Sequence, residues 1–176
     1  MIEFSVDNYN IIVSVGNAPD ILDFYKKHAM FIDDVDLKDE GSEVYVIISK
    51  NTNTPEFAII AFRTEPVGYA GFRPGIHYEK GILFIGAGTV VKTFDLATNK
   101  YIFEKNNGMG FWGWTKQNNF IFQQEETDFG VFSLSGTQLW DTFVSPPYNF
   151  EVIEDKIILK FDGIVEKRLL LTGERI

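Results

Sequence analysis

The two histidines are the residues of this 176-residue chain best suited to acid–base or metal chemistry near neutral pH. His28 lies in a segment with helical periodicity and His77 lies near an expected strand start, and neither has a second ligand at metal-binding spacing. We therefore expect both to be surface or hydrogen-bonded core residues. The sequence contains no cysteine, which excludes disulfides, thiolate zinc sites, iron–sulfur ligation and a cysteine nucleophile.

Two further patterns approach known ligand-binding motifs. Asp34, Asp36 and Lys38 have the spacing of an EF-hand loop, but the third position is a cation and Asp39 stands where that loop requires glycine. We expect a solvated acidic loop there, with a calcium site as the alternative. The Gly86-Ala87-Gly88 stretch begins like a dinucleotide-binding fingerprint, but its third glycine is missing and a strand follows, which favours a hairpin turn.

Catalytic motifs based on serine or paired carboxylates are also missing from the sequence. No serine stands in a G-x-S-x-G nucleophile elbow. Neighbouring acids such as Glu125 and Glu126 point apart on a strand or turn, so adjacency in sequence does not make them an acid–base pair. We therefore expect no enzymatic activity, no cofactor and no bound metal.

The net charge of −9 argues against a nucleic-acid partner, because binding phosphates requires clustered lysine and arginine. The first residues lack the basic start and apolar stretch of a secretory signal, and no apolar run approaches the ~18 residues that span a membrane. We expect a cytoplasmic protein without membrane contact. The acid is concentrated in residues 31–43, where six acids and one lysine give −5.

Seventeen Phe, seven Tyr and three Trp favour strands over helices. Similar phrases recur at Phe94–Lys100, Phe132–Gln138 and Leu169–Arg175, and together with an equivalent position at the end of an earlier apolar strand they give four anchor residues 34, 38 and 37 positions apart. These anchors are Phe62, Leu96, Leu134 and Leu171. Gly88 and Gly163 each stand eight residues before an anchor, in dipeptides typical of tight hairpins.

The spaces between anchors contain about four short strands each, which is the content of a propeller blade. Expected strands from the second anchor onward are Tyr101–Lys105, Phe111–Thr115, Asn119–Gln124, Phe129–Leu134, Gln138–Thr142, Tyr148–Ile153, Lys156–Phe161 and Ile164–Leu171. The phrase Phe94–Lys100 resembles the turn of quinoprotein-type and WD-like blades. That resemblance implies antiparallel four-stranded repeats in a small β-propeller-like fold, with a plain or curved meander as the alternative.

The whole chain, residues 1–176, is expected to form one mainly-β domain with one N-terminal helix over about residues 18–29. The acidic stretch after this helix is expected to be an exposed loop that leads into a strand at Val44–Ser49. The last repeat ends after its anchor turn, so Ile2–Val6 is expected to supply its missing fourth strand, with Asn10–Val15 starting the first repeat.

Trp112 and Trp114 are two residues apart, which predicts that both lie on one face of a strand. Buried, they fill the core between repeats; exposed, they form a platform for stacking on a sugar or gripping a protein. We favour the core position.

In general character, this small, acidic, cysteine-free sequence resembles bacterial immunity proteins that neutralise toxins, many of them basic nucleases. The resemblance implies a binding or inhibitor protein whose partner is a basic protein, with acids that mimic the phosphates of a nucleic acid. Charge alone selects the candidate partner-binding residues: Asp33, Asp34, Asp36, Asp39 and Glu40, then Glu125, Glu126 and Asp128 on a hairpin tip. The alternative is a small-molecule or carbohydrate-binding β-repeat protein, or an enzyme on that fold.

Overall fold

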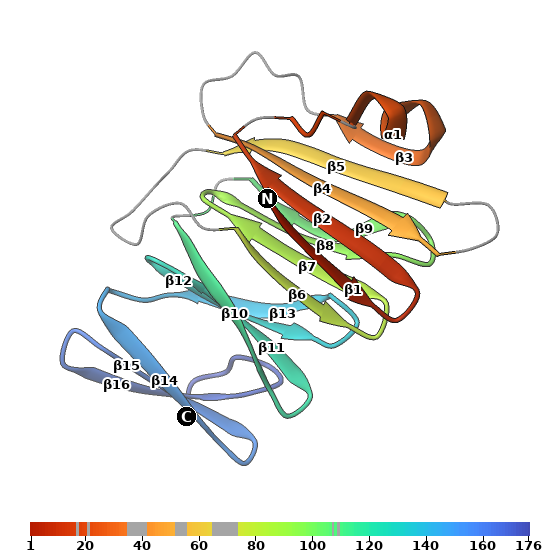
Figure 1. Cartoon of the computed structure of the whole chain (residues 1–176). Helices are drawn as coiled ribbons and strands as arrows, with labels where there is room; N and C mark the ends of the chain where they lie inside the picture. The colour runs from red at the N-terminus through yellow and green to blue at the C-terminus, as the bar shows by residue number, and fades with distance from the viewer. Residues whose placement is uncertain are drawn as a thin grey trace. The chain divides into compact units, whose positions relative to one another are not determined.

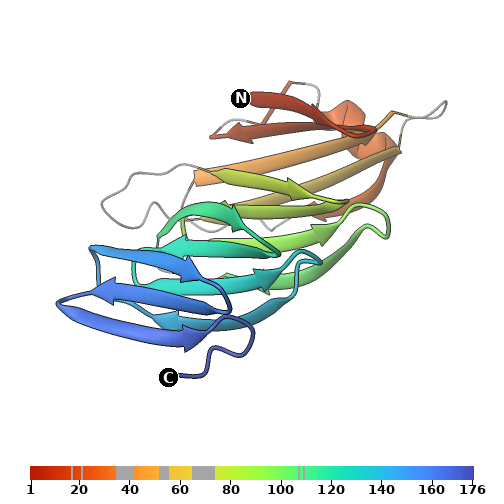
Figure 2. The same cartoon turned by 90° about the horizontal axis from the view of Figure 1, so that it is seen from below.

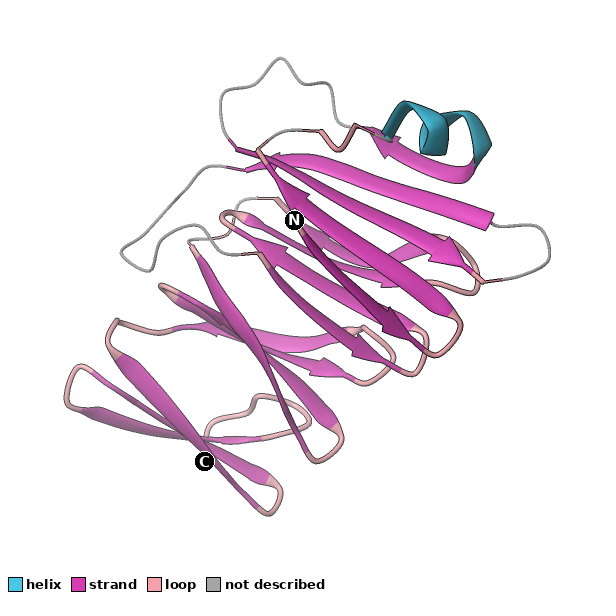
Figure 3. Cartoon of the chain, viewed as in Figure 1, coloured by secondary structure: helices cyan, strands magenta, loops and turns pink. Residues whose placement is uncertain are grey.

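A computed structural model describes residues 1–16, 18–20, 22–34, 42–51, 56–64, 74–106, 108 and 110–176. This part of the chain contains sixteen strands and one helix, and Figure 3 shows that it is mainly β. The fold class predicted from the sequence is therefore confirmed. The chain divides into two compact units, Met1–Pro66 (unit 1) and Val67–Ile176 (unit 2), each of which is described by itself. The prediction of a single domain stays a prediction.

Unit 1 contains one five-stranded sheet in the order β1-β2-β4-β5-β3 (Figure 1). Its strands are β1 (Ile2–Val6), β2 (Tyr9–Val15), β3 (Ala29–Asp34), β4 (Ser42–Lys50) and β5 (Glu56–Thr64). Neighbouring strands run antiparallel except β3, which pairs with β5 in parallel. The central strands β4 and β5 are each buried over five consecutive residues, which explains their near-continuous apolar sequences.

The helix α1 (Leu22–His28) covers one face of this sheet. Leu22 is buried against Tyr45 and Ile59, and Tyr25 packs beside them. The predicted helix is thus present but shorter, since Ala29 already belongs to β3. Asp23 in its first turn and the cations in its last turn complement the helix dipole.

Strand β3 corrects the expectation of an exposed loop after the helix. Residues 29–34 form an edge strand whose pairs with β5 include Ile32 with Ile59 and Asp33 with Ile60. The apolar residues before the acids explain the difference, because Ala29–Ile32 can pair with the buried strand β5. The same pairing then continues through Asp33 and Asp34.

Unit 2 consists of three antiparallel meanders in which every paired strand is the next in sequence. The first sheet contains β6 (Gly75–Glu79), β7 (Ile82–Ala87), β8 (Val90–Asp95) and β9 (Lys100–Lys105). The second contains β10 (Phe111–Gln117), β11 (Phe120–Glu125), β12 (Asp128–Ser133) and β13 (Gln138–Phe143). The third contains β14 (Tyr148–Ile153), β15 (Lys156–Phe161) and β16 (Ile164–Leu169). The predicted four-stranded repeat is confirmed for the first two.

The three sheets of unit 2 pack face to face in sequence order (Figure 2). Between the first and second, Phe84 meets Ile121 and Phe132. Between the second and third, apolar residues of β11 and β12 such as Phe122 meet Ile157 and others of β15. Each buried Phe or Ile contributes ~1.5–3 kcal/mol to stability, so these layers hold the repeats together.

The repeat in the structure differs from the predicted one in two anchors. The Leu96 N–H donates to the Gly81 carbonyl and the Leu170 N–H donates to the Asp155 carbonyl, so Leu170 is the counterpart of Leu96. Leu171, the predicted anchor, is 65% exposed. Phe62 lies inside β5 of unit 1, so the repeat does not extend to the first predicted anchor.

The N-terminal strand does not complete the last repeat, and that expectation was wrong. β1 forms a hairpin with β2, and the third sheet of unit 2 contains only β14, β15 and β16. Asp7 in the left-handed region (φ 49°) makes the two-residue turn that joins β1 to β2, and such a short loop closes at low entropic cost. Residues 174–176 lie beside β16 instead, joined to it by an isolated antiparallel β-bridge between Arg168 and Arg175 and by backbone hydrogen bonds.

Candidate functional site

The acidic residues divide unequally between the two units. Residues 1–66 contain twelve Asp and Glu against five Lys and Arg, a charge of −7, whereas residues 67–176 contain thirteen against eleven, a charge of −2. Most of the net charge therefore belongs to unit 1. A field of one sign raises the local concentration of oppositely charged partners.

The acids predicted to form a loop patch fall partly on β3. Asp33 is half-buried on this edge strand, and Asp34 is its last residue. The remaining three, Asp36, Asp39 and Glu40, lie outside the described residues, as does the EF-hand-like spacing completed by Lys38.

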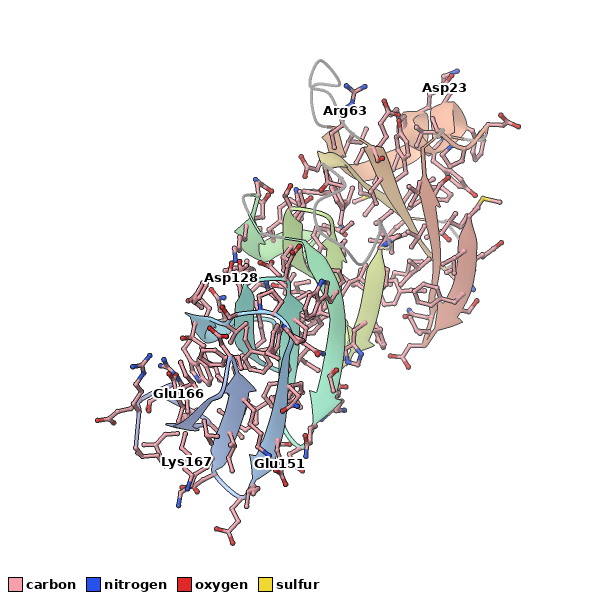
Figure 4. The ribbon with its side chains drawn as sticks, turned by 90° about the vertical axis from the view of Figure 1, so that its left-hand side faces the viewer. Asp23, Arg63, Asp128, Glu151, Glu166 and Lys167 are labelled. Carbon is pink, nitrogen blue, oxygen red and sulfur yellow. The ribbon has the colours of Figure 1, made fainter. Side chains whose placement is uncertain are left out.

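Other acids of unit 1 reach solvent where sequence reasoning did not single them out. Asp20 and Asp23 are exposed, and Figure 4 labels Asp23 on helix α1. Glu43 accepts hydrogen bonds from the Tyr45 hydroxyl and from Arg63, which lies 2.7 Å away. The hydrogen bond from Tyr45 has the largest effect and the one from Arg63 the next largest, and both lower the pKa of Glu43. Glu43 is therefore ionised at neutral pH.

The hairpin between β11 and β12 is present at the predicted place, but its acids are not presented together. Glu125, the last residue of β11, is fully buried, while Glu126 and Asp128 are half-buried. Figure 4 labels Asp128, whose side chain is 25% exposed. Glu125 therefore cannot contact a partner at the surface of this structure, and only the other two remain candidates.

Glu125 belongs instead to a buried charge cluster with Lys105. The Lys105 ammonium lies 3.1 Å from Glu125 Oε2 and 2.9 Å from Asp128 Oδ2, and Gln123 donates to Glu125 Oε1 at 2.5 Å. Burial alone would lower the pKa of Lys105, but the two carboxylates outweigh it and raise the pKa. Removing Lys105 would leave two carboxylates at the hairpin base without their shared cation, which is strongly destabilising for a buried charge.

Tyr148 and Gly108 complete this cluster. The Tyr148 hydroxyl donates to the Glu125 carbonyl at 2.8 Å, and burial followed by the Glu125 charge raises the pKa of Tyr148. A Cβ at Gly108 would stand 2.7 Å from Glu125 Oε1, so only glycine leaves room for the carboxylate. Strand alternation carried the signal that sequence reasoning missed, because Glu125 is in phase with the inward-facing Ile121 and Gln123.

Trp112 and Trp114 do not share one face of the sheet, contrary to the expectation. A β-bulge between Phe111 and Gly113 shifts the register of β10 against β11. Trp114 consequently packs edge-on against Phe84 in the first interface, whereas Trp112 stacks on Tyr148 at 5.2 Å and is 37% exposed. An extra residue in a strand re-aims its neighbours in this way.

In the described part of the chain, no group of three or more acids, histidines or cysteines is arranged to hold a metal ion. None of the described helical residues forms a helix long and apolar enough to cross a membrane.

No protein-family model matches the sequence, and no curated protein matches it. A solved structure with some likeness is BamB from Moraxella catarrhalis, with a TM-score of 0.40 and 16% sequence identity. The alignment covers 74% of this chain and 44% of BamB, so the chain spans less than half of that protein's length. The likeness is weak and carries no argument about function.

Proposed function

We propose that this protein is a cytoplasmic, non-catalytic inhibitor that binds a basic protein, in the manner of an immunity protein bound to a nuclease toxin. The observation that supports the proposal is the −7 charge of unit 1 against −2 for the larger unit 2. A nuclease presents lysine and arginine to the phosphates of its substrate. An acidic unit that occupies this surface excludes the substrate.

Electrostatic attraction of this kind speeds the encounter more than it strengthens the final complex. It acts over ~8–10 Å at physiological salt and weakens as salt is added. The proposal therefore predicts an association rate that falls steeply with ionic strength, while the dissociation rate changes less.

The first experiment identifies the partner by capture on the tagged full chain from the native organism, followed by purification. Association kinetics are then measured by stopped flow from low to high salt. The test variant combines Asp36→Asn, Asp39→Asn and Glu40→Gln, and we expect it to associate several-fold more slowly at low salt and at nearly the same rate at high salt.

A matched control neutralises three exposed acids of unit 2, by Asp141→Asn, Glu151→Gln and Asp162→Asn. It removes the same charge, so a general effect of net charge slows both variants equally. Equal slowing, or a captured partner without a basic surface, contradicts the proposal. Turnover of any substrate by the purified protein contradicts the non-catalytic part.

The carbohydrate-binding alternative depended on two tryptophans on one face. With Trp114 in the core and one ring face of Trp112 stacked on Tyr148, that paired platform is not formed.

A further inference from the structure

A groove of about 510 Å³ opens at one end of the second and third sheets of unit 2. Three turns surround this groove, which we name the turn groove: the β10–β11 turn, the β14–β15 turn and the turn after β16. Its lining residues are Asn118, Asn119, Phe120, Glu154, Asp155, Leu169, Leu170, Leu171 and Thr172. Its volume lies within the range of ~300–1,000 Å³ found for ligand sites.

The floor of the turn groove is apolar and firmly held. Leu170 is 3% exposed and belongs to the core between the two sheets, and Phe120 packs against that core. The Leu170 N–H donates to the Asp155 carbonyl at 2.8 Å, which ties the floor to one wall. Leu171 also lines the groove and is 65% exposed, so a large apolar side chain faces solvent beside this floor.

The wall formed by the β14–β15 turn is acidic. Glu154 and Asp155 are both exposed, and Glu154 has the left-handed backbone (φ 55°) of a tight hairpin turn. Among the described residues that line the groove there is no lysine or arginine to neutralise them. The groove therefore combines an apolar floor with two negative charges.

The equivalent turns of the first and second sheets lack this combination. The β6–β7 turn has Lys80 and Gly81, and the β10–β11 turn has Asn118 and Asn119, in place of Glu154 and Asp155. The residue that follows the anchor leucine is Ala97 in the first repeat and Ser135 in the second, where the last repeat has the exposed Leu171. The acidic, apolar groove is thus specific to the last repeat and does not follow from the repeat geometry alone.

We propose that the turn groove binds an extended segment of a protein partner in which one apolar side chain is flanked by lysine or arginine. The apolar side chain enters beside Leu171 and covers Phe120, while the flanking cations pair with Glu154 and Asp155. This inference is independent of the proposed function, because the groove belongs to unit 2 and the acidic excess to unit 1.

The test uses the full chain labelled with ¹⁵N and the synthetic peptide Lys-Arg-Leu-Arg-Lys as the probe. We expect saturable shifts of the amide signals of Asn118, Asp155 and Thr172 as peptide is added. Two comparison peptides, Lys-Arg-Ser-Arg-Lys and Glu-Asp-Leu-Asp-Glu, remove the apolar side chain or reverse the charge. Both should bind at least several-fold more weakly; equal binding of either overturns the proposal, as does the absence of saturable shifts with the first peptide.

Two pairs of variants then locate the binding energy. Glu154→Gln with Asp155→Asn should raise the Kd for the first peptide about fivefold, given ~0.2–1 kcal/mol for each exposed ion pair. Asp141→Asn with Asp162→Asn removes the same charge from exposed positions outside the groove and should leave the Kd within about twofold. Similar increases of the Kd in both variants would show that net charge alone causes the effect, and this would overturn the assignment of Glu154 and Asp155 to the binding site.

The apolar contact is tested by Leu171→Ser, with Val165→Ser as its control at 60% exposure on the third sheet. Because both side chains are largely exposed, we expect both variants to fold, which the amide spectrum verifies. Only Leu171→Ser should weaken the peptide, by about threefold or more, since burying apolar surface is worth ~25 cal/mol per Å². An unchanged Kd for Leu171→Ser contradicts the proposal, whatever the acidic partner experiment shows for unit 1.

Discussion

Arg168 joins three segments of unit 2 through its guanidinium group. It donates to the Gly173 carbonyl at 2.7 Å and to Thr142 Oγ1 at 3.0 Å, and it forms an ion pair with Glu166, which Figure 4 labels. The same Glu166 carboxylate is also paired with Arg175 at 2.8 Å. The two arginines differ in burial, because the Arg168 side chain is 13% exposed and that of Arg175 is 70% exposed.

We predict that Arg168→Ala lowers the free energy of unfolding by ~3 kcal/mol, because it leaves the buried Gly173 carbonyl without the Arg168 donor and leaves the mostly buried Glu166 carboxylate with the exposed Arg175 as its remaining arginine partner. Arg175→Ala should cost less than ~1 kcal/mol, as exposed ion pairs do. Urea unfolding of both variants measures the difference. Equal losses would show that burial does not decide the strength of these two ion pairs.

His77 makes the folded state sensitive to mild acid. Burial lowers the pKa of His77, the Glu79 carboxylate opposes that effect, and the Lys116 ammonium adds to it. The unfolded chain therefore takes up a proton on this residue at a higher pH than the folded chain does, so stability falls as pH drops below about 6.5.

We predict that His77→Gln reduces this loss of stability between pH 7.5 and about pH 5. Urea unfolding at several pH values measures the slope, and His28→Gln, at an exposed histidine, is the matched control. An unchanged slope in the His77 variant would show that other groups dominate the titration in this range.

The single residues of the candidate site were only partly predictable. The hairpin that contains Glu126 and Asp128 was predictable, because its turn consists of polar residues between two apolar strands. Charge then selected these two acids within it. Charge also selected Glu125, but this residue is fully buried, and its ion-pair partner Lys105 lies on β9, twenty residues earlier. The alternation along β11 indicates that Glu125 is buried, but no local pattern identifies Lys105, on a strand of another repeat, as its partner.

At the scale of the element, a glycine pair on β6 and β7 creates the seat for Phe111 at the start of β10. Gly75 and Gly86 are directly paired across the two strands. A Cβ would stand 2.7 Å from the Phe111 ring at the first and 2.3 Å at the second, so neither position has room for a side chain. Phe111 is 4% exposed in this seat.

We predict that Gly86→Ala destabilises the protein by ~1–3 kcal/mol, the usual cost of overpacking. Gly113→Ala is the control, because a Cβ there meets nothing within 4 Å, and it should change stability by less than ~0.5 kcal/mol. Thermal and urea unfolding compare the two. A Phe111→Leu background should reduce the Gly86→Ala cost, and failure to do so would mean that the clash lies elsewhere.

Most elements could be predicted from the sequence, and the errors have physical causes. Tyr148–Ile153 and Lys156–Phe161 have the predicted bounds because period-two alternation and a Glu-Asp turn define them locally. Strand β3 was missed because its partner β5 lies more than twenty residues away. The role of β1 was misjudged because the repeat pattern suggested a distant partner, whereas a tight turn supplies a near one.

At the scale of the whole molecule, the two units carry different spectroscopic reporters. All three tryptophans, Trp112, Trp114 and Trp140, belong to unit 2, while the described helix belongs to unit 1. Tryptophan fluorescence therefore follows unit 2 alone, and far-ultraviolet circular dichroism follows both units.

We predict that the two signals change together in urea, with one midpoint, because the sequence contains no linker long enough to separate two independent domains. Equilibrium unfolding monitored by both signals on the same samples tests the single-domain prediction. Two separated midpoints would show that the units unfold independently.

The order of strands in the two units implies different folding rates. In unit 2 every strand pair joins two strands that are consecutive in sequence, so each sheet assembles through short loops. In unit 1, β3 pairs with β5, for example Phe31 with Ala58, and not with β4, which follows it in sequence. β3 can therefore join the sheet only after β5 has formed. Contacts between distant positions slow the crossing of the folding barrier. Docking of β3 is therefore expected among the last events of refolding, and a nascent chain completes its first sheet only after β5 has left the ribosome.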